Sequence, residues 1–214
     1  MKNIFCFRQG EHIMKKLQNL TIVNGTGRFL HLYKAEYDAD GVKYPYEVVS
    51  RKNLEKLENG KKLGESDDAV CIVPIFENGD VLAIKEFRYA INDYLLEFPA
   101  GLIDPGEDAV KAAIRELKEE TGLETEKVLF NIPGGYSSAG MTDERVAVVG
   151  LLVKGTYHDV HGKEEISSFK TTVDDLFERI TAGEKCSARM QCILLGMKMY
   201  HLLADARFSP NIKK

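Results

Sequence analysis

One unbroken stretch of the chain, residues 101–123, combines a helical pattern with a dense set of charged positions. Its sequence reads GLIDPGEDAVKAAIRELKEETGL. From Val110 onward, apolar residues recur at steps of three and four, which predicts one apolar stripe along a helix. Pro105-Gly106 precedes this pattern and Gly122 follows it, as expected at helix boundaries. The stretch therefore predicts a short helix held between two glycine-containing turns.

Three carboxylates crowd the C-terminal end of this expected helix. Glu116 and Glu120 are four residues apart and share a face, and Glu119 lies beside them. The helix dipole favours cations at this end, and Arg115, four residues before Glu119, is expected to offset only one of the negative charges. A bound divalent cation removes the conflict, and Mg²⁺ or Mn²⁺ suits such hard oxygen ligands. The alternative is an acidic helix face that water solvates.

The full spacing across the stretch is Gly-x5-Glu-x7-Arg-Glu-Leu-x-Glu-Glu-x-Gly-Leu, matched without a gap. It resembles the signature of the Nudix hydrolases at every fixed position. The resemblance implies that Glu116 and Glu120 are metal ligands and that Glu119 holds a metal or a bound water. It also implies that Arg115 positions a glutamate and that the backbone carbonyl of Ala100 binds metal.

The rest of the chain predicts one α/β domain preceded by a small antiparallel β subdomain. Residues 67–214 contain strands with helices before, after and between them, which indicates an α/β/α sandwich around a mixed sheet. Strands are expected there at residues 70–76, 81–87, 94–98, 127–132, 145–153 and 165–171, a loop at 133–144, and later helices at 173–182 and 187–204. Residues 19–66 are expected to hold three short strands, at 20–23, 29–37 and 44–49, and a linker. Residues 1–18 are expected to be a disordered extension, with a start at either Met1 or Met14.

Composition narrows the class of protein. The formal net charge of -4 gives no support to nucleic-acid binding, which usually needs a basic surface. The longest apolar runs, residues 69–76 and 146–153, are too short to span a membrane. The four cysteines show no C-x-x-C pair, so we expect reduced thiols in a cytoplasmic protein. A small polyanionic ligand remains compatible with the charge, because a metal supplies positive charge locally.

The flanks of the signature resemble the ADP-ribose pyrophosphatase branch of the family. This resemblance rests on residues 86–89 (EFRY), on residues 96–104 (LEFPAGLID) and on the N-terminal β unit. It implies a nucleoside diphosphate sugar as substrate, ADP-ribose first, and a homodimer whose β unit helps form the nucleotide pocket. Arg88 then binds phosphate, and Glu97 holds the terminal ribose or a bound water. The plain alternatives are a surface arginine and a salt bridge that supports the loop.

The catalytic base and the exact substrate are left open by the sequence. The family usually places a further glutamate after the signature, as base or additional metal ligand, and Glu164 matches by position. Glu144 competes for this role but suits substrate contact better, and Arg51 is a further candidate for substrate contact. The branch often has a proline where this chain has Ala139, whereas the proline here is Pro133. The alternatives are therefore a hydrolase of GDP-mannose or another sugar nucleotide, and a Nudix-fold regulator that binds without turnover.

Overall fold

The structure is a computed structural model that describes residues 16–23, 27–53, 66–161 and 165–208. The contacts divide the chain into two compact units. The N-terminal unit is Met1–Glu65 together with Ser138–Glu144, and the main unit is Ser66–Ser137 together with Arg145–Lys214. A segment from the middle of the sequence therefore belongs to the N-terminal unit, which the sequence pattern did not indicate.

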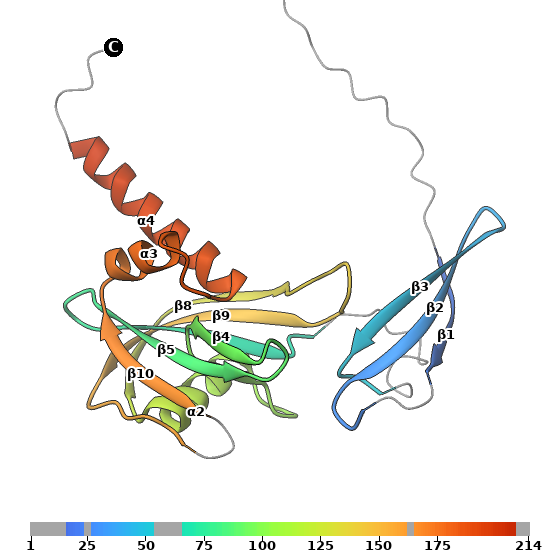
Figure 1. Cartoon of the computed structure of the whole chain (residues 1–214), viewed down its shortest axis with the longest axis horizontal. Coiled ribbons are helices and arrows are strands. Elements are labelled where there is room, and N and C mark those ends of the chain that lie inside the picture. The colour runs from blue at the N-terminus through green and yellow to red at the C-terminus, as the bar shows by residue number, and fades with distance from the viewer. Residues whose placement is uncertain (1–15, 24–26, 54–65, 162–164, 209–214) are drawn as a thin grey trace, which may run out of the picture. The chain divides into compact units, whose positions relative to one another are not determined.

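The N-terminal unit contains a three-stranded antiparallel sheet in the order β1-β2-β3 (Figure 1). Its strands are β1 (Lys16–Ile22), β2 (His31–Ala39) and β3 (Val42–Ser50). Asp40 and Gly41 join β2 to β3 with φ values of 54° and 79°, as a two-residue hairpin requires. β1 begins inside the range expected to be a disordered extension, so the first strand is longer than the sequence pattern indicates.

This sheet has one apolar and one polar face, because successive side chains of a strand point to opposite sides. On the apolar face lie the cross-strand pairs Tyr33–Val48, Ala35–Tyr46, Tyr37–Tyr44 and Ala39–Val42. On the polar face lie the pairs Lys34–Glu47, Glu36–Pro45 and Asp38–Lys43, with the apolar pair Leu32–Val49 at one end. Tyr33 is fully buried, whereas Val42 and Tyr46 are 53% and 46% exposed. The apolar face is therefore only partly covered.

The main unit is built on a seven-stranded sheet in the order β10-β5-β4-β9-β8, with β6 beside β5 and β7 beside β4. The strands are β4 (Ala69–Ile75), β5 (Val81–Arg88), β6 (Asp93–Glu97), β7 (Ala100–Leu102), β8 (Glu124–Tyr136), β9 (Arg145–Lys154) and β10 (Ile166–Thr171). β4 and β9 pair in parallel, and the other pairs are antiparallel. The sheet is therefore mixed, as expected.

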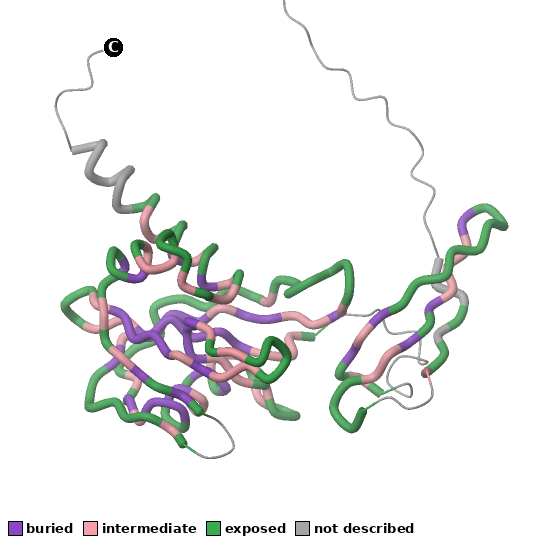
Figure 2. Tube along the Cα trace, viewed as in Figure 1, coloured by how far each residue is buried: buried purple, intermediate pink, exposed green. Residues whose placement is uncertain are grey.

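Helices cover both faces of this sheet, with α2 (Ala109–Thr121) on one side and α3 (Val173–Thr181) and α4 (Ala188–Phe208) on the other (Figure 1). One buried cluster includes Val70, Ile72, Ala113 and Leu117, and a second includes Cys71, Val73, Leu176 and Leu194. Neighbouring residues of β4 thus belong to two buried clusters on opposite faces of the sheet. The buried segments concentrate on the central strands (Figure 2). The expected α/β/α sandwich is confirmed.

The helix that carries the acidic residues begins and ends through local contacts. The side chain of Asp108 accepts a hydrogen bond from the Lys111 N–H at 2.9 Å and caps the N-terminus of α2. At the other end, Gly122 has a φ of 77° and donates its N–H to the Lys118 carbonyl at 3.0 Å. α2 therefore starts within one residue of the start that its apolar spacing predicts.

β8 differs from the prediction, because it continues to Tyr136 through residues expected to form a loop. The register between β8 and β9 shifts between Ile132 and Gly135, which places Pro133 in a bulge. β8 lies at the edge of the sheet, where the missing N–H of a proline costs no ladder hydrogen bond. A proline followed by two glycines is thus tolerated within a strand here.

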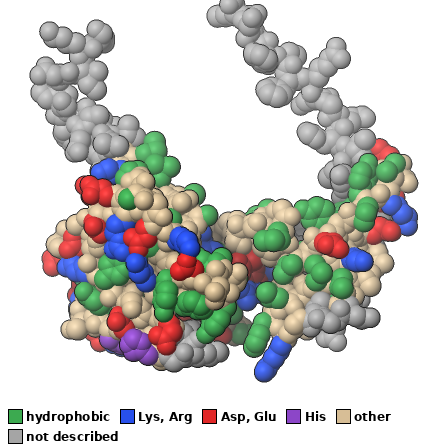
Figure 3. Space-filling model, in the orientation of Figure 1, with side chains coloured by type: hydrophobic (Ala, Val, Ile, Leu, Met, Phe, Trp, Pro, Cys, Tyr) green, Lys and Arg blue, Asp and Glu red, His purple; other side chains and the backbone are tan. Residues whose placement is uncertain are grey.

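α4 is longer than expected and exposes apolar side chains, including Leu195, Met199 and Tyr200. In the part of the chain that the structure describes, no helix has the length and apolar character to cross a membrane. On the visible face of the main unit, acidic and basic side chains are interspersed with apolar ones (Figure 3).

Candidate active site

The two ends of the signature meet because β7 pairs with the start of β4 beneath α2. A Cβ atom at Gly101 would lie 2.0 Å from Cδ of Glu116, so the Glu116 carboxylate fills the space beside this glycine. One turn later, the Glu120 carboxylate accepts a hydrogen bond from the Ala100 N–H at 3.3 Å. Two acids of the helix therefore lie against the backbone of Ala100-Gly101.

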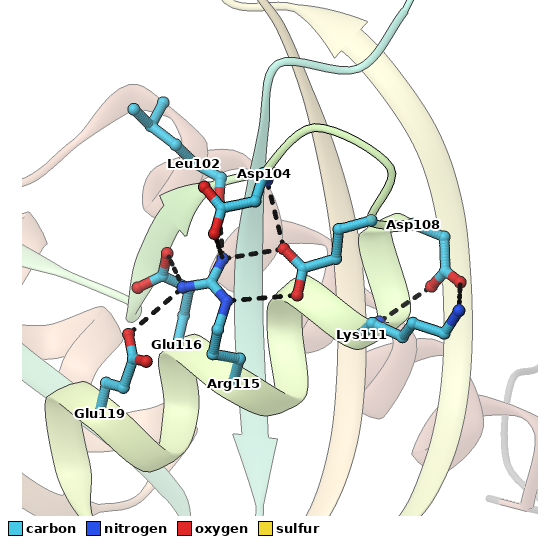
Figure 4. A network of polar contacts seen from close by, with 8 residues as sticks. Leu102, Asp104, Asp108, Lys111, Arg115, Glu116 and Glu119 are labelled. Carbon is cyan, nitrogen blue, oxygen red and sulfur yellow. Dashed lines mark hydrogen bonds and ion pairs between the residues drawn. The ribbon is translucent and has the colours of Figure 1, made fainter.

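Arg115 connects the acidic residues of the signature (Figure 4). Its Nε and Nη2 donate to the two carboxylate oxygens of Glu107 at 3.2 and 2.9 Å. Its Nη1 donates to Glu116 at 2.8 Å and to Glu119 at 3.2 Å, and Nη2 also donates to the Leu102 carbonyl at 3.0 Å. Hydrogen bonds to Glu107 and Glu116 raise the pKa of Arg115, and the same guanidinium lowers the pKa of Glu107. The arginine thus ties the turn before α2 to its last turns.

The expectation that Arg115 offsets a single carboxylate is wrong. A guanidinium carries five N–H donors, and here they reach three glutamates and one carbonyl. The sequence showed only the helical neighbour Glu119, because Glu107 comes close through the turn that precedes α2.

The end of α2 has the donor chemistry of a divalent-cation site. Glu116, Glu119 and Glu120 supply hard carboxylate oxygens, and the carbonyl of Ala100 lies on the strand beside them. Among the described residues, no three His, Cys, Asp or Glu side chains converge as a ready-made metal site. Two of the acids are instead hydrogen-bonded to Arg115.

A second charged cluster surrounds Arg88 at the end of β5. Its Nε donates to the Glu97 carboxylate at 2.5 Å, and its Nη1 lies 2.8 Å from an oxygen of Glu86. Glu97 and Glu86 are only 4% and 9% exposed. Burial by itself would lower the pKa of Arg88, but Glu97, Glu86 and Glu120 outweigh that effect and raise it. The structure thus brings together two of the four residues predicted to bind substrate, Arg88 and Glu97, and adds Glu86.

Glu86 was missed by the sequence analysis, although a signal for it exists. It lies in β5 two residues before Arg88, and residues two apart in a strand share a face. A buried glutamate on the same face as an arginine indicates an ion pair.

The remaining candidates are Arg51, Glu144 and Glu164. Arg51 donates through Nε to Glu144 at 3.0 Å, and this pair belongs to the N-terminal unit. Glu164 lies outside the described residues. β10 begins at Ile166, within one residue of the strand start expected at residue 165. The catalytic and binding roles of these residues remain predictions.

A contact that no motif predicts joins the end of α2 to the segment after β9. A Cβ atom at Gly122 would lie 2.3 Å from Nδ1 of His158, and the His158 N–H donates to the Thr121 carbonyl at 3.0 Å. A glycine is therefore required at position 122 for two reasons: the backbone has a positive φ, and the His158 imidazole occupies the space where a Cβ atom would lie.

Comparisons with known proteins agree with this geometry. Residues 65–189 match the NUDIX domain family. The chain is 28% identical over 182 residues to an ADP-ribose pyrophosphatase of Bacillus subtilis (strain 168), covering 82% of this chain and 90% of that protein. It is 34% identical over 134 residues to an ADP-sugar pyrophosphatase of Mus musculus, covering 60% of this chain and 57% of that protein.

A solved structure described as an ADP compounds hydrolase has the same fold, with a TM-score of 0.64 at 23% identity, and the match covers 87% of this chain and 93% of that one. The region matched by the family contains the signature, α2 and the sheet against which they pack. The chain therefore belongs to the Nudix family and is a Nudix hydrolase.

Proposed function

We propose that the protein is a divalent-cation-dependent pyrophosphatase that hydrolyses ADP-ribose to AMP and ribose 5-phosphate. The main support is the acidic end of α2, packed against Ala100-Gly101 and within electrostatic reach of Arg88. The name of the Bacillus subtilis relative supports ADP-ribose as the substrate. Mg²⁺ is the proposed cation, and Mn²⁺ is expected to replace it.

The reaction adds one water across the bridge between two phosphates. The water oxygen bonds to one phosphorus, the bond from that phosphorus to the bridging oxygen breaks, and the bridging oxygen leaves with the other phosphate. Negative charge grows on the phosphoryl oxygens in the transition state and needs preorganised positive charge nearby. A bound divalent cation neutralises this charge and lowers the pKa of bound water.

The signature residues would hold and order the cation site. Glu116 and Glu120 are the proposed ligands, together with the carbonyl of Ala100, and Glu119 holds cation or bound water. Arg115 is proposed to position Glu116 and Glu119, because its donors are already occupied by the protein. A guanidinium used in this way fixes the carboxylates without contacting substrate.

The residues outside the signature are proposed to bind substrate and remove a proton. Arg88 grips phosphate through the donors that its two ion pairs leave, and Glu97 orients that guanidinium or contacts the ribose. Glu164 is proposed to take the proton from the attacking water or to act as an additional ligand. Glu144, paired with Arg51, is the rival base and suits substrate contact.

A homodimer is proposed to complete the nucleotide pocket. The support is the apolar face of the N-terminal sheet, where Val42, Tyr44 and Tyr46 are partly exposed. We propose that residues 19–66 act as a subdomain that contacts a second subunit, while residues 67–214 carry the chemistry.

The test is a panel of sugar nucleotides incubated with Mg²⁺, with Mn²⁺ or with EDTA, followed by chromatography of the products. ADP-ribose is expected to be hydrolysed fastest and to give AMP and ribose 5-phosphate, with no release in EDTA. When the reaction is run in water enriched with a heavy oxygen isotope, either AMP or ribose 5-phosphate should carry a single heavy oxygen atom. Faster hydrolysis of GDP-mannose would transfer the assignment to that substrate class. Binding of ADP-ribose without turnover in either metal would identify a regulator instead.

A further inference from the structure

Arg189, at the start of α4, differs from the other arginines of the main unit in its partners. Among the side chains that the structure describes there, it is the one arginine that forms no ion pair. Each of the others pairs with at least one carboxylate: Arg88, Arg115, Arg145 and Arg179. Arg189 is half-buried and donates a hydrogen bond to the Cys71 thiol. A buried thiol is neutral at pH 7, so this contact leaves the charge of the guanidinium uncompensated.

The place of Arg189 within its helix adds to this imbalance. It is the second residue of α4, whose first turn contains no acidic residue. The N-terminus of a helix carries partial positive charge, so a cation there raises the electrostatic free energy and an anion lowers it. The first turn of α3, by contrast, contains Asp174 and Asp175. An anionic ligand of Arg189 would supply the negative charge that the first turn of α4 lacks.

The sheet opens beside Arg189. β4 pairs with β5 only at Ile75 and Val81, near the end of β4. Toward its start, β4 pairs with β7 instead, and β5 pairs with β6. β4 and β5 therefore separate, and the two short strands β6 and β7 line the opening between them. Cys71, the partner of Arg189, lies in β4 directly opposite Ala100 of β7.

This opening lies beside the proposed active site. Cys71 belongs to the buried cluster under α3 and α4, so Arg189 approaches the sheet from that side. Glu97 and Glu120 also act on Cys71 through space, although both belong to the two charged clusters of the candidate site. The uncompensated arginine is therefore close to Ala100, to Glu97 and to the acidic end of α2.

We propose that Arg189 is a further phosphate-binding residue of the pyrophosphatase site, which it reaches from α4 at the opening between β4 and β5. Its guanidinium binds oxygens of the diphosphate, and Arg88 binds the same group from β5. A guanidinium suits this role because its planar fork of N–H donors matches two phosphate oxygens. α4, which lies outside the signature, then forms part of the site. This inference rests on the proposed function, because the ligand is the diphosphate of its substrate.

The test compares ADP binding by wild type and by Arg189→Gln in calorimetry with Mg²⁺. The variant should bind ADP about 10- to 100-fold more weakly, the loss expected for one charge-assisted hydrogen bond. Lys198→Gln is the matched control, because Lys198 also lies in α4 and the substitution removes the same charge. Lys198 pairs with Asp174 at 2.6 Å, and this control should bind ADP as wild type does. Equal ADP affinity in wild type and Arg189→Gln would overturn the proposal.

Two further measurements exclude indirect effects of the substitution. Adenosine lacks phosphate, so Arg189→Gln should bind it as wild type does. An equal weakening of ADP and adenosine would show a distorted site and overturn the proposal. Arg189→Lys keeps the charge but loses the fork of donors, and should recover only part of the ADP affinity. Full recovery would show that Arg189 merely offsets Glu97 and Glu120, and would overturn direct binding.

Inorganic pyrophosphate is a second probe, because it carries the diphosphate without nucleoside or sugar. Its affinity should also fall in Arg189→Gln, and a wild-type protein that binds neither ADP nor pyrophosphate would overturn the proposal. Failure of wild type to hydrolyse ADP-ribose, with these affinity differences intact, counts against the proposed function alone. If Arg189→Gln does not fold, Arg189→Lys decides. Weaker binding of ADP with unchanged binding of adenosine then supports the proposal, and unchanged binding of both contradicts it.

Discussion

At the scale of single residues, the site depends on which partner each carboxylate has. Glu116 occupies the space beside Gly101 and accepts from Arg115, whereas Glu120 turns to the Ala100 N–H. Glu119, whose side chain is 59% exposed, contacts Arg115 from the helix surface. Three glutamates of one helical turn therefore have three different environments, although their spacing makes them look equivalent.

The first prediction concerns the proposed metal ligands. Glu116→Gln and Glu120→Gln should each lower kcat by at least about 10²- to 10³-fold, the loss typical of removing one group that stabilises transition-state charge. Both variants should remain folded, because glutamine keeps the shape and can still accept a hydrogen bond. Steady-state kinetics with Mg²⁺ and circular dichroism measure the two outcomes. Near-normal turnover in either variant would contradict the metal-site proposal.

At the scale of elements, α2 is held at both ends, and the segment after β9 packs on its C-terminus. His158 contacts Gly122 through its ring and Thr121 through its N–H. The β9–β10 segment is also fixed further along, where Val160 and Ile166 exchange backbone hydrogen bonds at 2.9 Å. The acidic helix and the start of β10 are thus connected through backbone contacts.

The second prediction separates two requirements at Gly122. Gly122→Ala should destabilise the protein by about 2–4 kcal/mol, because the new methyl group adds a clash with His158 to the strain of a positive φ. Gly183→Ala is the matched control, since Gly183 has a φ of 98° but open space around it, and it should cost about 1 kcal/mol. Urea unfolding measures both.

A second substitution tests whether the clash with His158 causes the extra destabilisation of Gly122→Ala. Adding His158→Ala to Gly122→Ala should bring the cost down to that of the control. An equal cost for Gly122→Ala and Gly183→Ala would show that only the backbone angle matters.

The third prediction concerns Glu184, in the turn between α3 and α4. Arg179 holds its carboxylate with bonds of 2.6 and 3.0 Å, and with help from Lys85 lowers the pKa of Glu184 from 4.5 to about 2. A lowered pKa stabilises the fold above the unfolded value and loses this contribution as the pH falls from 4.5 toward 2. Because the side chain is 24% exposed, we expect about 1–2 kcal/mol.

Glu184→Gln should therefore lower the free energy of unfolding at pH 7 and have a much smaller effect near pH 2, as measured by urea titration at both values. Glu126→Gln is the control, because Glu126 pairs with Lys154 at an exposed site and should change little at either pH. A constant difference between wild type and Glu184→Gln across this range would show that the stabilisation is not electrostatic.

At the scale of the whole molecule, the chain forms two units. The N-terminal unit includes residues 138–144, which come from the middle of the sequence. Tyr46 donates its hydroxyl to the Gly140 carbonyl at 2.6 Å, and the Val49 N–H donates to the Met141 carbonyl at 2.9 Å. Residues 138–144 thus add contacts to a sheet that is too small to bury a core of its own. Part of the apolar face nevertheless remains exposed.

The fourth prediction concerns the proposed dimer. Val42→Asp should produce a monomer in light scattering and raise KM for ADP-ribose, because the charge falls on the exposed apolar face. Thr21→Asp introduces the same charge opposite Lys34, on the polar face, and should remain a dimer. A monomeric wild-type protein, or a dimeric Val42→Asp variant, would contradict the shared-pocket proposal.

The sequence by itself determined the elements and the type of chemistry. Apolar residues at helical spacing predicted α2, and the apolar runs at residues 70–76 and 145–153 predicted strands of a mixed sheet, all of which the structure confirms. The fixed spacing of residues 101–123 also indicated the Nudix family, which the comparisons confirm. These features are local, because side chains within one helix or strand are placed by its own period.

Only the tertiary structure decided which residues meet across elements. It placed Glu116 beside Gly101, Glu86 and Glu97 around Arg88, and His158 over Gly122. It also placed Pro133 within a strand, because β8 lies at the edge of the sheet. Each of these outcomes depends on strand register or on a turn joining two elements, and no periodic pattern in the sequence encodes which distant residues those arrangements bring together.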